Sequence, residues 1–499
     1  MTVTARPAFI VLTCLFFSGA LAACSASSAP GASTRGTGGS GNDTGAAGSL
    51  NLVGTGGTAG TTGINVSDGG TGAALSDCGS GPPTSLSGVV YDPAGAVPLY
   101  NVVLFVPGEA LSPISTGAAC QTCDGDFSGK PQAVALSDAT GHFKIDNVPA
   151  GDNIPLVIQV GKWRRQVTLA HVDACTDNPI ADKDLTRLPR NQSEGNIPHI
   201  AISIGGSDSL ECLIRRIGVD DSEFSTPTGT GRVHLYRLGE KAATTMQVNG
   251  VSTAVPDAGT LWGSVDSLMK YDLMLLSCTG ASGDPGIDNP NAPNVRRYAD
   301  QGGRIFGSHW HNAWIRTEAE TKADPLWYPQ VVKFPSGAHG IDTTLNAQID
   351  VSFPKGQAFR DWLMSVGAST TPGQIPIQGA EHTMDSILPK AILDPEGPVY
   401  AAGPGAQQWI YATDPVNSSQ TLQYFSMNTP VAGAECGRMV FSDLHVSTGS
   451  GDTTKVPFPT GCSTTPLTPQ EKALEFMLFD LSSCVQSDTK PPEPPPVVK

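Results

Sequence analysis

Three short segments of the chain place cysteine, histidine, serine and aspartate directly after predicted buried strands. They are Ser277-Cys278-Thr279, Ser308-His309-Trp310-His311 and Ser442-Asp443-Leu444-His445. In an open sheet of parallel strands, ligands collect beyond the carboxyl ends of the strands. The first two segments therefore predict a ligand-binding cleft lined by Cys278, Thr279, Ser308, His309, Trp310 and His311.

Imidazole and carboxylate groups bind divalent metal ions and also transfer protons. A divalent metal is the one cofactor that these segments suggest, with His309, His311, Asp443 and His445 as its predicted ligands. Both rings of a His-x-His pair on an extended segment point the same way, which favours a shared ligand. His309 and His445 are also the candidate catalytic residues, which could equally act as general acid and base on a bound sugar or ring. The alternative is that these histidines are structural, each hydrogen-bonded or packed against Trp310 or Trp314.

Alternating strands and helices must position these segments. Apolar runs predict strands at 200–204, 232–236, 272–276, 304–306 and 438–441, and helical spacing predicts helices near 210–217, 294–299 and 470–481. Before the first of these helices, Asp208 and Glu211 are spaced like a capping box. This order predicts a doubly wound α/β (flavodoxin-like) domain over residues 196–485.

Parts of this region resemble the ThuA-like branch of the class I glutamine amidotransferase-like superfamily. The matching stretches are Tyr271–Leu276, Tyr298–His309 and Gly437–His445. Residues from about 318 to 429 match less well and are interpreted as an insertion, which contributes Glu381 and His382 as further candidate ligands. The resemblance implies an amidotransferase-like fold and an activity on carbohydrate-related material.

The chain departs from this family where an amidotransferase carries its nucleophile. The resemblance places that cysteine at about His309, no Gly-x-Cys-x-Gly sequence occurs, and Cys278 lies one strand too early. A thiol nucleophile needs a sharp strand-to-helix turn and a histidine base. We therefore expect a degenerate amidotransferase-like domain with a ligand-binding or interaction role. The alternative is a carbohydrate-related ThuA-like enzyme that uses a His/Asp site, with or without a metal.

Residues 78–190 have a different pattern, with short alternating strands separated by glycine and proline turns. This pattern predicts a small antiparallel β-sandwich, so the chain is multidomain. Residues 87–92, 101–103, 137–143 and 147–151 resemble the carboxypeptidase regulatory-like domain, a prealbumin-like sandwich, which implies a non-catalytic role. Lys162-Trp163-Arg164-Arg165 is interpreted as a packed tryptophan in a salt-bridged hairpin, and the alternative is contact with lipid headgroups or glycans.

The two ends of the chain carry no pattern of a folded domain. After Arg6, an apolar run leads to Leu21-Ala22-Ala23-Cys24, which resembles the lipobox of bacterial lipoproteins. The resemblance implies a signal peptide over 1–23, acylation of Cys24 and, because Ser25 follows, an outer-membrane location in the cell envelope. The alternative is an ordinary signal peptide. Residues 24–77 are a Gly/Ser/Thr-rich stretch expected to be a disordered tether, and residues 486–499 form a proline-rich tail.

The net charge indicates which classes of partner to expect, and the cysteine content indicates whether disulfides form. A net charge of −16 argues against nucleic acid, so we expect the membrane, through the lipid anchor, and a carbohydrate or another envelope component as partners. Eleven cysteines leave nine after the signal peptide and Cys24 are set aside, and these predict disulfides with at least one thiol left over. Cys120 and Cys123 have the CxxC spacing, for which disulfides are favoured over redox or zinc chemistry.

Overall fold

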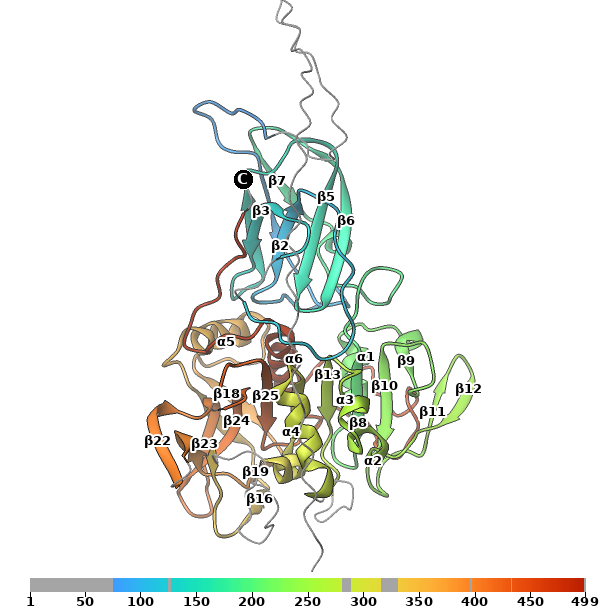
Figure 1. Ribbon diagram of the computed structural model, residues 1–499, viewed down its shortest axis with the longest axis vertical. Coiled ribbons are helices and arrows are strands. Elements are labelled where there is room, and N and C mark those ends of the chain that lie inside the picture. Colours follow the sequence, from blue (N-terminus) through green and yellow to red (C-terminus); the bar gives the residue numbers. More distant parts are fainter. Residues whose placement is uncertain are drawn as a thin grey trace, which may run out of the picture. The chain divides into compact units, whose positions relative to one another are not determined.

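The computed structural model describes residues 75–123, 127–280, 289–315, 331–394, 397–431 and 433–497. These residues belong to one compact unit that spans residues 67–499. The predicted signal peptide, Cys24 and the tether up to residue 74 lie outside the described residues. The described chain is mostly β-structure arranged in several sheets, with few helices (Figure 1).

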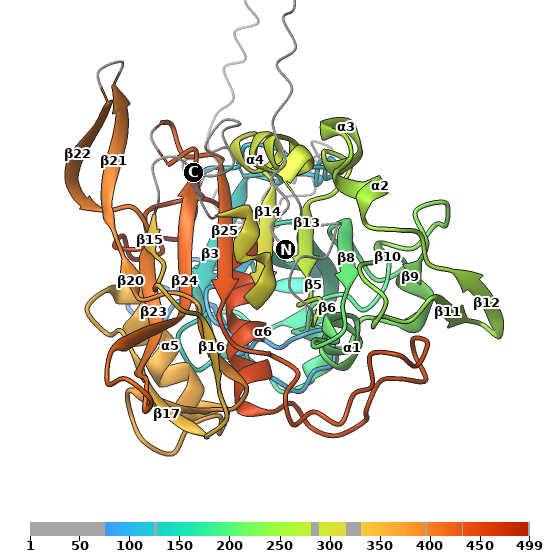
Figure 2. The ribbon, with the colours of Figure 1, turned by 90° about the horizontal axis from the view of Figure 1, so that it is seen from below.

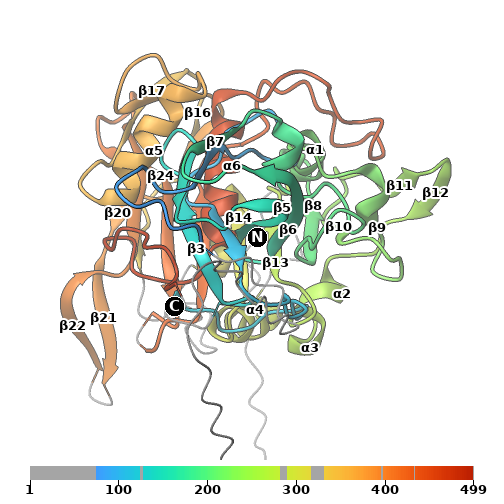
Figure 3. The same cartoon turned by 90° about the horizontal axis from the view of Figure 1, so that it is seen from above.

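Two small sheets carry the strands predicted within residues 78–190 (Figure 3). One sheet has the order β4-β1-β7, with bounds His142–Asp146, Ser85–Val89 and Asp177–Ile180. The other has the order β3-β2-β5-β6, with bounds Pro131–Leu136, Val103–Pro107, Gly151–Val160 and Trp163–Val172. Alternate residues, such as Leu104, Ile145 and Ile158, are buried in a shared apolar core because successive side chains of a strand point to opposite faces.

A ten-stranded sheet holds most of the rest of the chain (Figure 2). Its order is β18-β17-β23-β24-β25-β14-β13-β8-β10-β9. The strands from β25 to β9 run parallel, and their bounds are Gly437–Ser442, Arg304–Ser308, Leu273–Leu276, Ile200–Ile204, Val233–Arg237 and Phe224–Ser225. The strands β24 (Gln420–Thr429), β23 (Gln407–Thr413), β17 (Leu345–Ile349) and β18 (Gln374–Ile377) continue the sheet in antiparallel pairs.

The predicted insertion therefore builds the antiparallel half of this sheet. The sheet is therefore mixed, with parallel strands in one half only, and differs from the doubly wound sheet expected from the sequence. The reason is that strands β17, β18, β23 and β24 extend the sheet edge, with β25 bridging the two halves.

Helices lie on both faces of the parallel strands. Alternate strand residues enter two separate apolar cores: Ile202, Leu275 and Phe306 contribute to one, and Ala201, Met274 and Ile305 to the other. The first core includes residues of α1 (Leu210–Arg216), α5 (Pro354–Ser365) and α6 (Pro469–Ser482). The second includes residues of α2 (Gly259–Trp262), α3 (Val265–Leu268) and α4 (Ala292–Asp300). Thr468 and Glu471 form a capping box at the start of α6.

Short elements complete the described chain. Four two-stranded pairs are β11 with β12 (Thr245–Val248, Val251–Ala254), β15 with β20 (Val332–Lys333, Ser386–Ile387), β16 with β19 (His339–Ile341, Ala380–His382) and β21 with β22 (Pro389–Asp394, Gly397–Pro404). The 3-10 helices are η1 (Lys183–Leu185), η2 (Asp221–Glu223), η3 (Asn289–Asn291) and η4 (His309–Trp314). No described helix has the length and apolarity needed to cross a membrane.

Side chains of the sandwich region contact the ten-stranded sheet and its helices. Trp163 is fully buried and packs edge-on against Phe479 of α6, with ring centroids 5.9 Å apart. Lys162 is also buried, and its Nζ lies 2.5 Å from Asp272 Oδ1. These contacts agree with the packed-tryptophan interpretation of this segment rather than with contact to lipid or glycan. The pairs Cys120–Cys436 and Cys123–Cys484 add covalent links between residues 78–190 and the later part of the chain.

Eight cysteines lie in four pairs at disulfide distance, as the composition led us to expect. The pairs are Cys78–Cys175, Cys120–Cys436, Cys123–Cys484 and Cys212–Cys462. Cys120 and Cys123 thus bind two distant cysteines rather than each other or a metal. Among the described cysteines, only Cys278 is free, and it is buried.

The beginning of the proline-rich tail also belongs to the packed structure. Asp488 is buried, and its Oδ1 lies 2.7 Å from Arg438 Nη2 and 3.4 Å from Lys355 Nζ. Its Oδ2 accepts a hydrogen bond from Ser426 of β24. A buried carboxylate needs such partners, because burial without them costs several kcal/mol.

Candidate functional site

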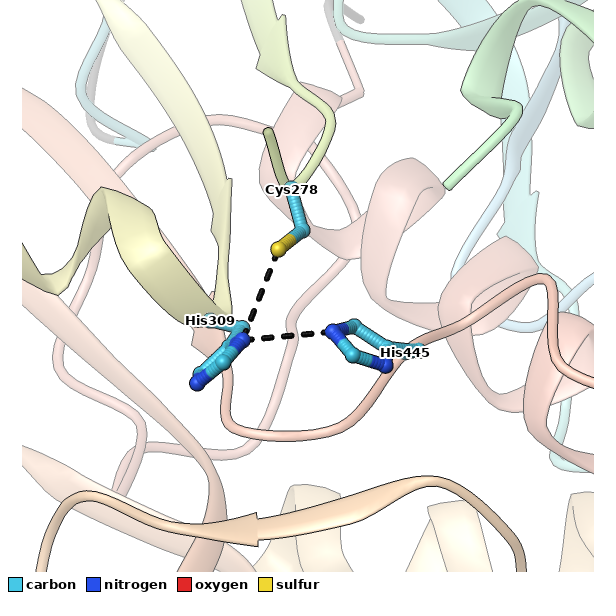
Figure 4. Close-up of side chains that lie close together, drawn as sticks. All are labelled: Cys278, His309 and His445. Carbon is cyan, nitrogen blue, oxygen red and sulfur yellow. Dashed lines mark hydrogen bonds between the residues drawn. The ribbon is translucent and has the colours of Figure 1, made fainter. Parts of the chain in front are cut away.

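The site begins with the register of three neighbouring parallel strands. In β13, β14 and β25, Leu276 lies opposite Gly307, and Ser308 lies opposite Ser442. The chain leaves all three strands at the same edge of the sheet. Cys278, His309 and His445 follow within one to three residues, so their side chains meet there (Figure 4).

These three side chains form a close cluster. Cys278 Sγ lies 3.4 Å from His309 Nδ1, and the same nitrogen lies 3.2 Å from His445 Nε2. One potential ligand atom from each residue lies within 4.8 Å of the other two. Cys278 and His309 are buried, and His445 is half-buried.

His309 has an unusual backbone conformation at the end of its strand. Its φ is 37°, in the left-handed region that costs a non-glycine residue about 1–3 kcal/mol. The strand ends here and η4 begins, so the chain turns sharply between Ser308 and Trp310. The turn directs the His309 ring toward Cys278 and His445.

The same turn separates His311 from the cluster. Residues 309–314 form a 3-10 helix instead of the extended segment assumed for the His-x-His pair, so the two rings do not point the same way. His311 is fully buried, with its Nε2 3.0 Å from the Ser277 carbonyl oxygen and its Nδ1 accepting a hydrogen bond from Trp314 Nε1. Both ring nitrogens are therefore used by structural contacts, as the alternative interpretation described.

Asp443, another of the predicted metal ligands, contacts Thr383 rather than the cluster. Its two carboxylate oxygens accept hydrogen bonds from the backbone N–H and the hydroxyl of Thr383, at 2.8 and 2.6 Å. Burial raises the pKa of Asp443 to about 8. Asp443 thus fixes the segment around Thr383 to the end of β25.

The other predicted cleft residues surround the cluster. Thr279 and Ser308 are buried beside Cys278 and His309, whereas Trp310 is half-buried and its ring centroid lies 4.6 Å from that of His309. Of the six residues of the predicted cleft, Trp310 alone is partly exposed, and the other five are buried.

Asp208 supports the cluster, and sequence reasoning missed this role. It is fully buried in the loop after β8, and its Oδ2 accepts hydrogen bonds from the Cys278 N–H at 3.2 Å and from the Ser308 hydroxyl at 2.5 Å. Its Oδ1 accepts the Ser447 N–H. The expected capping box is absent, because Ser209 is the N-cap residue of α1 and makes no side-chain cap. Asp208 instead joins the ends of three strands.

Glu381 of β19 lies near the ring nitrogen of His309 that is not used by the cluster. Its Oε2 lies 3.7 Å from His309 Nε2, the ring nitrogen that does not face Cys278 and His445. Burial raises the pKa of Glu381 above its ordinary value. The neighbouring His382 belongs to a separate group of side chains described below.

Burial also shifts the pKa values of side chains in and beside the cluster. It raises the pKa of the Cys278 thiol to about 12 and lowers the pKa of His309 to about 3 and that of His311 to about 4. The nearby His445 and His311 lower the pKa of His309 further. Without a cation, Cys278 is a protonated thiol and His309 a neutral imidazole at neutral pH, so Cys278 is a weak nucleophile.

Comparisons with known proteins give weak likenesses only. No family model and no curated protein matches the chain. Among solved structures, the chain is similar to a putative ThuA-like protein from Bacteroides uniformis, with 10% identity over 50% of this chain and 82% of that chain and a TM-score of 0.27. It is also similar to two cohesin–X-dockerin complexes from Acetivibrio cellulolyticus, an N-terminal and a C-terminal interface mutant. The first has 12% identity over 28% of this chain and 85% of that chain, with a TM-score of 0.16. The second has 14% identity over 30% and 79%, with a TM-score of 0.13.

Proposed function

We propose that this protein is a lipid-anchored envelope protein that holds a zinc ion between Cys278, His309 and His445 and binds an oxygen-bearing ligand through that ion. The lipobox-like segment supports the anchor, and the sandwich is then a supporting module. In the same proposal, the parallel half of the large sheet is an amidotransferase-like domain that has lost its thiol nucleophile.

One observation carries the metal proposal: His309 Nδ1 faces two partners at once. A ring nitrogen has a single in-plane position, which holds either one proton or one lone pair. A network without metal can therefore satisfy only one of the contacts with Cys278 and His445. A cation between the three atoms satisfies all of them, because each ligand directs one lone pair at it.

The distances fit a tetrahedral zinc ion. With Zn–S near 2.3 Å and Zn–N near 2.05 Å, tetrahedral angles place sulfur about 3.6 Å from nitrogen and two nitrogens about 3.3 Å apart. The corresponding distances here are 3.4 Å and 3.2 Å. A thiolate with two imidazoles favours zinc over magnesium or calcium, which prefer oxygen ligands. Coordination would also deprotonate the thiol in spite of its raised pKa.

Glu381 fits the role of a second-shell carboxylate. A histidine that binds zinc through one nitrogen usually donates its other N–H to a carboxylate or carbonyl oxygen, which fixes its tautomer. Glu381 lies on that side of His309. Three protein ligands leave the fourth position of a tetrahedral ion for a ligand or water.

The convergence of His309 and His445 also favours a second candidate function, an enzyme acting on carbohydrate-related material. A zinc ion held by Cys278, His309 and His445 would lower the pKa of a bound water to near neutral and so supply a nucleophile, and Glu381 would fix the orientation of His309. Turnover of envelope glycans that requires zinc and is lost in Glu381→Gln, with zinc content unchanged, would favour the enzyme over the binding protein.

The metal proposal can be tested on the full-length protein by measuring zinc content and the zinc–ligand distances by X-ray absorption. We expect this site to contribute one zinc equivalent, with a Zn–S distance near 2.3 Å. The His309→Ala/His445→Ala variant should lose this equivalent, and Cys278→Ser should lose the Zn–S distance. His171→Ala is the matched control, because His171 is exposed in the sandwich hairpin. Absence of sulfur-bound zinc in the unaltered protein would refute the proposal.

The anchor is tested separately. Replacing Cys24 with serine should move the protein from the membrane fraction to the soluble fraction, because the acyl chains supply the membrane affinity. An unchanged membrane fraction would contradict the lipoprotein proposal and leave the zinc proposal intact.

A further inference from the structure

A second group of potential metal ligands lies apart from Cys278, His309 and His445. It consists of His339 on β16, His382 on β19 and Asp414 after β23, with one ligand atom of each within 4.8 Å of the others. His339 lies directly opposite His382 in the antiparallel β16–β19 pair. His382 and Asp414 are fully buried, and His339 is half-buried.

Asp414 places one oxygen between the two imidazoles. Its Oδ2 lies 2.6 Å from His382 Nδ1 and 2.9 Å from His339 Nε2, while its Oδ1 accepts the Val416 N–H. A single carboxylate oxygen therefore faces two ring nitrogens at the centre of the group.

His382 has a carboxylate on each side of its ring. Its Nε2 lies 3.0 Å from Asp385 Oδ1, so both ring nitrogens face carboxylates. A neutral imidazole has only one N–H and would turn a lone pair toward one of these anions. Either the ring is an imidazolium, or Nδ1 binds a cation and Nε2–H donates to Asp385 in the carboxylate–histidine–metal arrangement.

The orientation of His339 favours the cation. Its Nε2 is buried and makes no hydrogen bond to any described residue, although Asp414 Oδ2 is only 2.9 Å away. At that distance, a nitrogen without a hydrogen bond is not directed at the oxygen. His339 Nε2 therefore has the orientation of a metal ligand, which points at an ion rather than at its neighbour, whereas His382 Nδ1 is hydrogen-bonded to Asp414 Oδ2.

The group is separate from the site around His309. Successive side chains of a strand point to opposite sides, and Glu381 of β19 reaches His309 while the next residue, His382, reaches Asp414. Asp385, the outer partner of His382, pairs with Lys333 Nζ at 2.8 Å. This gives the second group its own supporting shell.

We infer that His339, His382 and Asp414 form a second zinc-class cation site with two nitrogen ligands and one oxygen ligand, independent of the cysteine-containing site. To admit the ion, Asp414 Oδ2 must move apart from His339 Nε2 by about 0.4 Å and from His382 Nδ1 by about 0.7 Å, since tetrahedral zinc holds neighbouring N and O atoms about 3.3 Å apart. The half-buried His339 ring gives the ion access to solvent and leaves a position for water.

The experiment is a zinc titration of the full-length protein against a chromophoric chelator, with His339→Ala, His309→Ala/His445→Ala and the triple variant. His142→Ala, an exposed sandwich histidine, is the control. We expect two equivalents for the unaltered protein, one for His339→Ala, one for the double variant and none for the triple variant. X-ray absorption of the zinc-loaded double variant should show nitrogen and oxygen neighbours without sulfur.

The outcomes separate the two proposals. Zinc that is lost in His339→Ala but not in the double variant would support this site and refute the one at Cys278. A stoichiometry unaffected by His339→Ala, or a double variant that binds no zinc while circular dichroism shows its fold retained, would refute this site. Because His339 is at the surface of the group, its replacement by alanine should leave the fold intact.

Discussion

Replacing Glu211 with glutamine should make the fold more stable at neutral pH. Glu211 lies in the first turn of α1, is buried, and has one carboxylate oxygen, Oε2, without a hydrogen-bond partner among the described residues. Burial and the nearby carboxylates of Asp452 and Asp208 raise its pKa from 4.5 to about 8. A glutamine side chain has the shape of the protonated acid and cannot ionise.

The size of the effect follows from linkage. A carboxyl group whose pKa is higher in the folded than in the unfolded chain contributes stability that is complete below pH 4.5 and is lost as pH rises toward about 8. Between these values, each pH unit removes about 1.4 kcal/mol. The unaltered protein and Glu211→Gln should therefore be equally stable at pH 4. At pH 7 the variant should be more stable by roughly 3 kcal/mol.

The assay is urea unfolding at pH 4, 5, 6 and 7 with the disulfides intact, followed by two probes to check two-state behaviour. Glu109→Gln is the control, because Glu109 is half-exposed in a surface pair with Lys130. The control should follow the pH dependence of the unaltered protein. If the curves for Glu211→Gln and the unaltered protein stay parallel from pH 4 to pH 7, the reasoning from burial is wrong.

Three further changes test the support of the candidate site and the packing of the fold. Asp208→Asn should weaken zinc binding about 10–100-fold, since Asp208 holds the Cys278 N–H; a titration that gives unchanged affinity would contradict this role. Gly161→Ala should destabilise the fold by roughly 3 kcal/mol or more in urea unfolding, because φ is 53° and a Cβ would lie 1.7 Å from the Ser482 carbonyl oxygen. Gly337→Ala, where nothing lies within 4 Å and φ is outside the left-handed region, is its control and should lose much less. Replacing Cys123 and Cys484 together with serine should lower the free energy of unfolding by about 2–5 kcal/mol, and a loss below 1 kcal/mol would show that the bridge contributes little.

The strands were predicted well where the spacing of apolar residues and the residue composition indicate the same structure. The run Ile200–Ile204 is a strand with those bounds, because five consecutive apolar or small residues bury both faces of a central strand. The helix expected near 470–481 is α6, with Thr468 as its N-cap. Apolar pattern alone did not reveal that residues 345–429 extend the same sheet, since antiparallel strands at a sheet edge leave no distinct mark in one sequence.

The site was predictable only where it depends on strand ends. Cys278, His309 and His445 meet because three parallel strands end together. His311 was misplaced because the turn at His309 begins a 3-10 helix, which the sequence Ser-His-Trp-His does not indicate. Asp208 was mistaken for a cap because the local pattern fits one, whereas its partners lie 70, 100 and 239 residues away. Such long-range contacts cannot be derived from spacing.

The pairing of the CxxC cysteines also determines when the fold can be completed. Cys120 and Cys123 bind cysteines 316 and 361 residues further along the chain. A polypeptide made from its N-terminus carries these two thiols, three positions apart, through most of its synthesis before either partner exists. During that time the nearest oxidation products are a bond between them or with Cys78 and Cys175. If the chain is oxidised as it emerges, early bonds would be non-native, and a cell lacking thiol–disulfide isomerase activity should then accumulate mispaired chains.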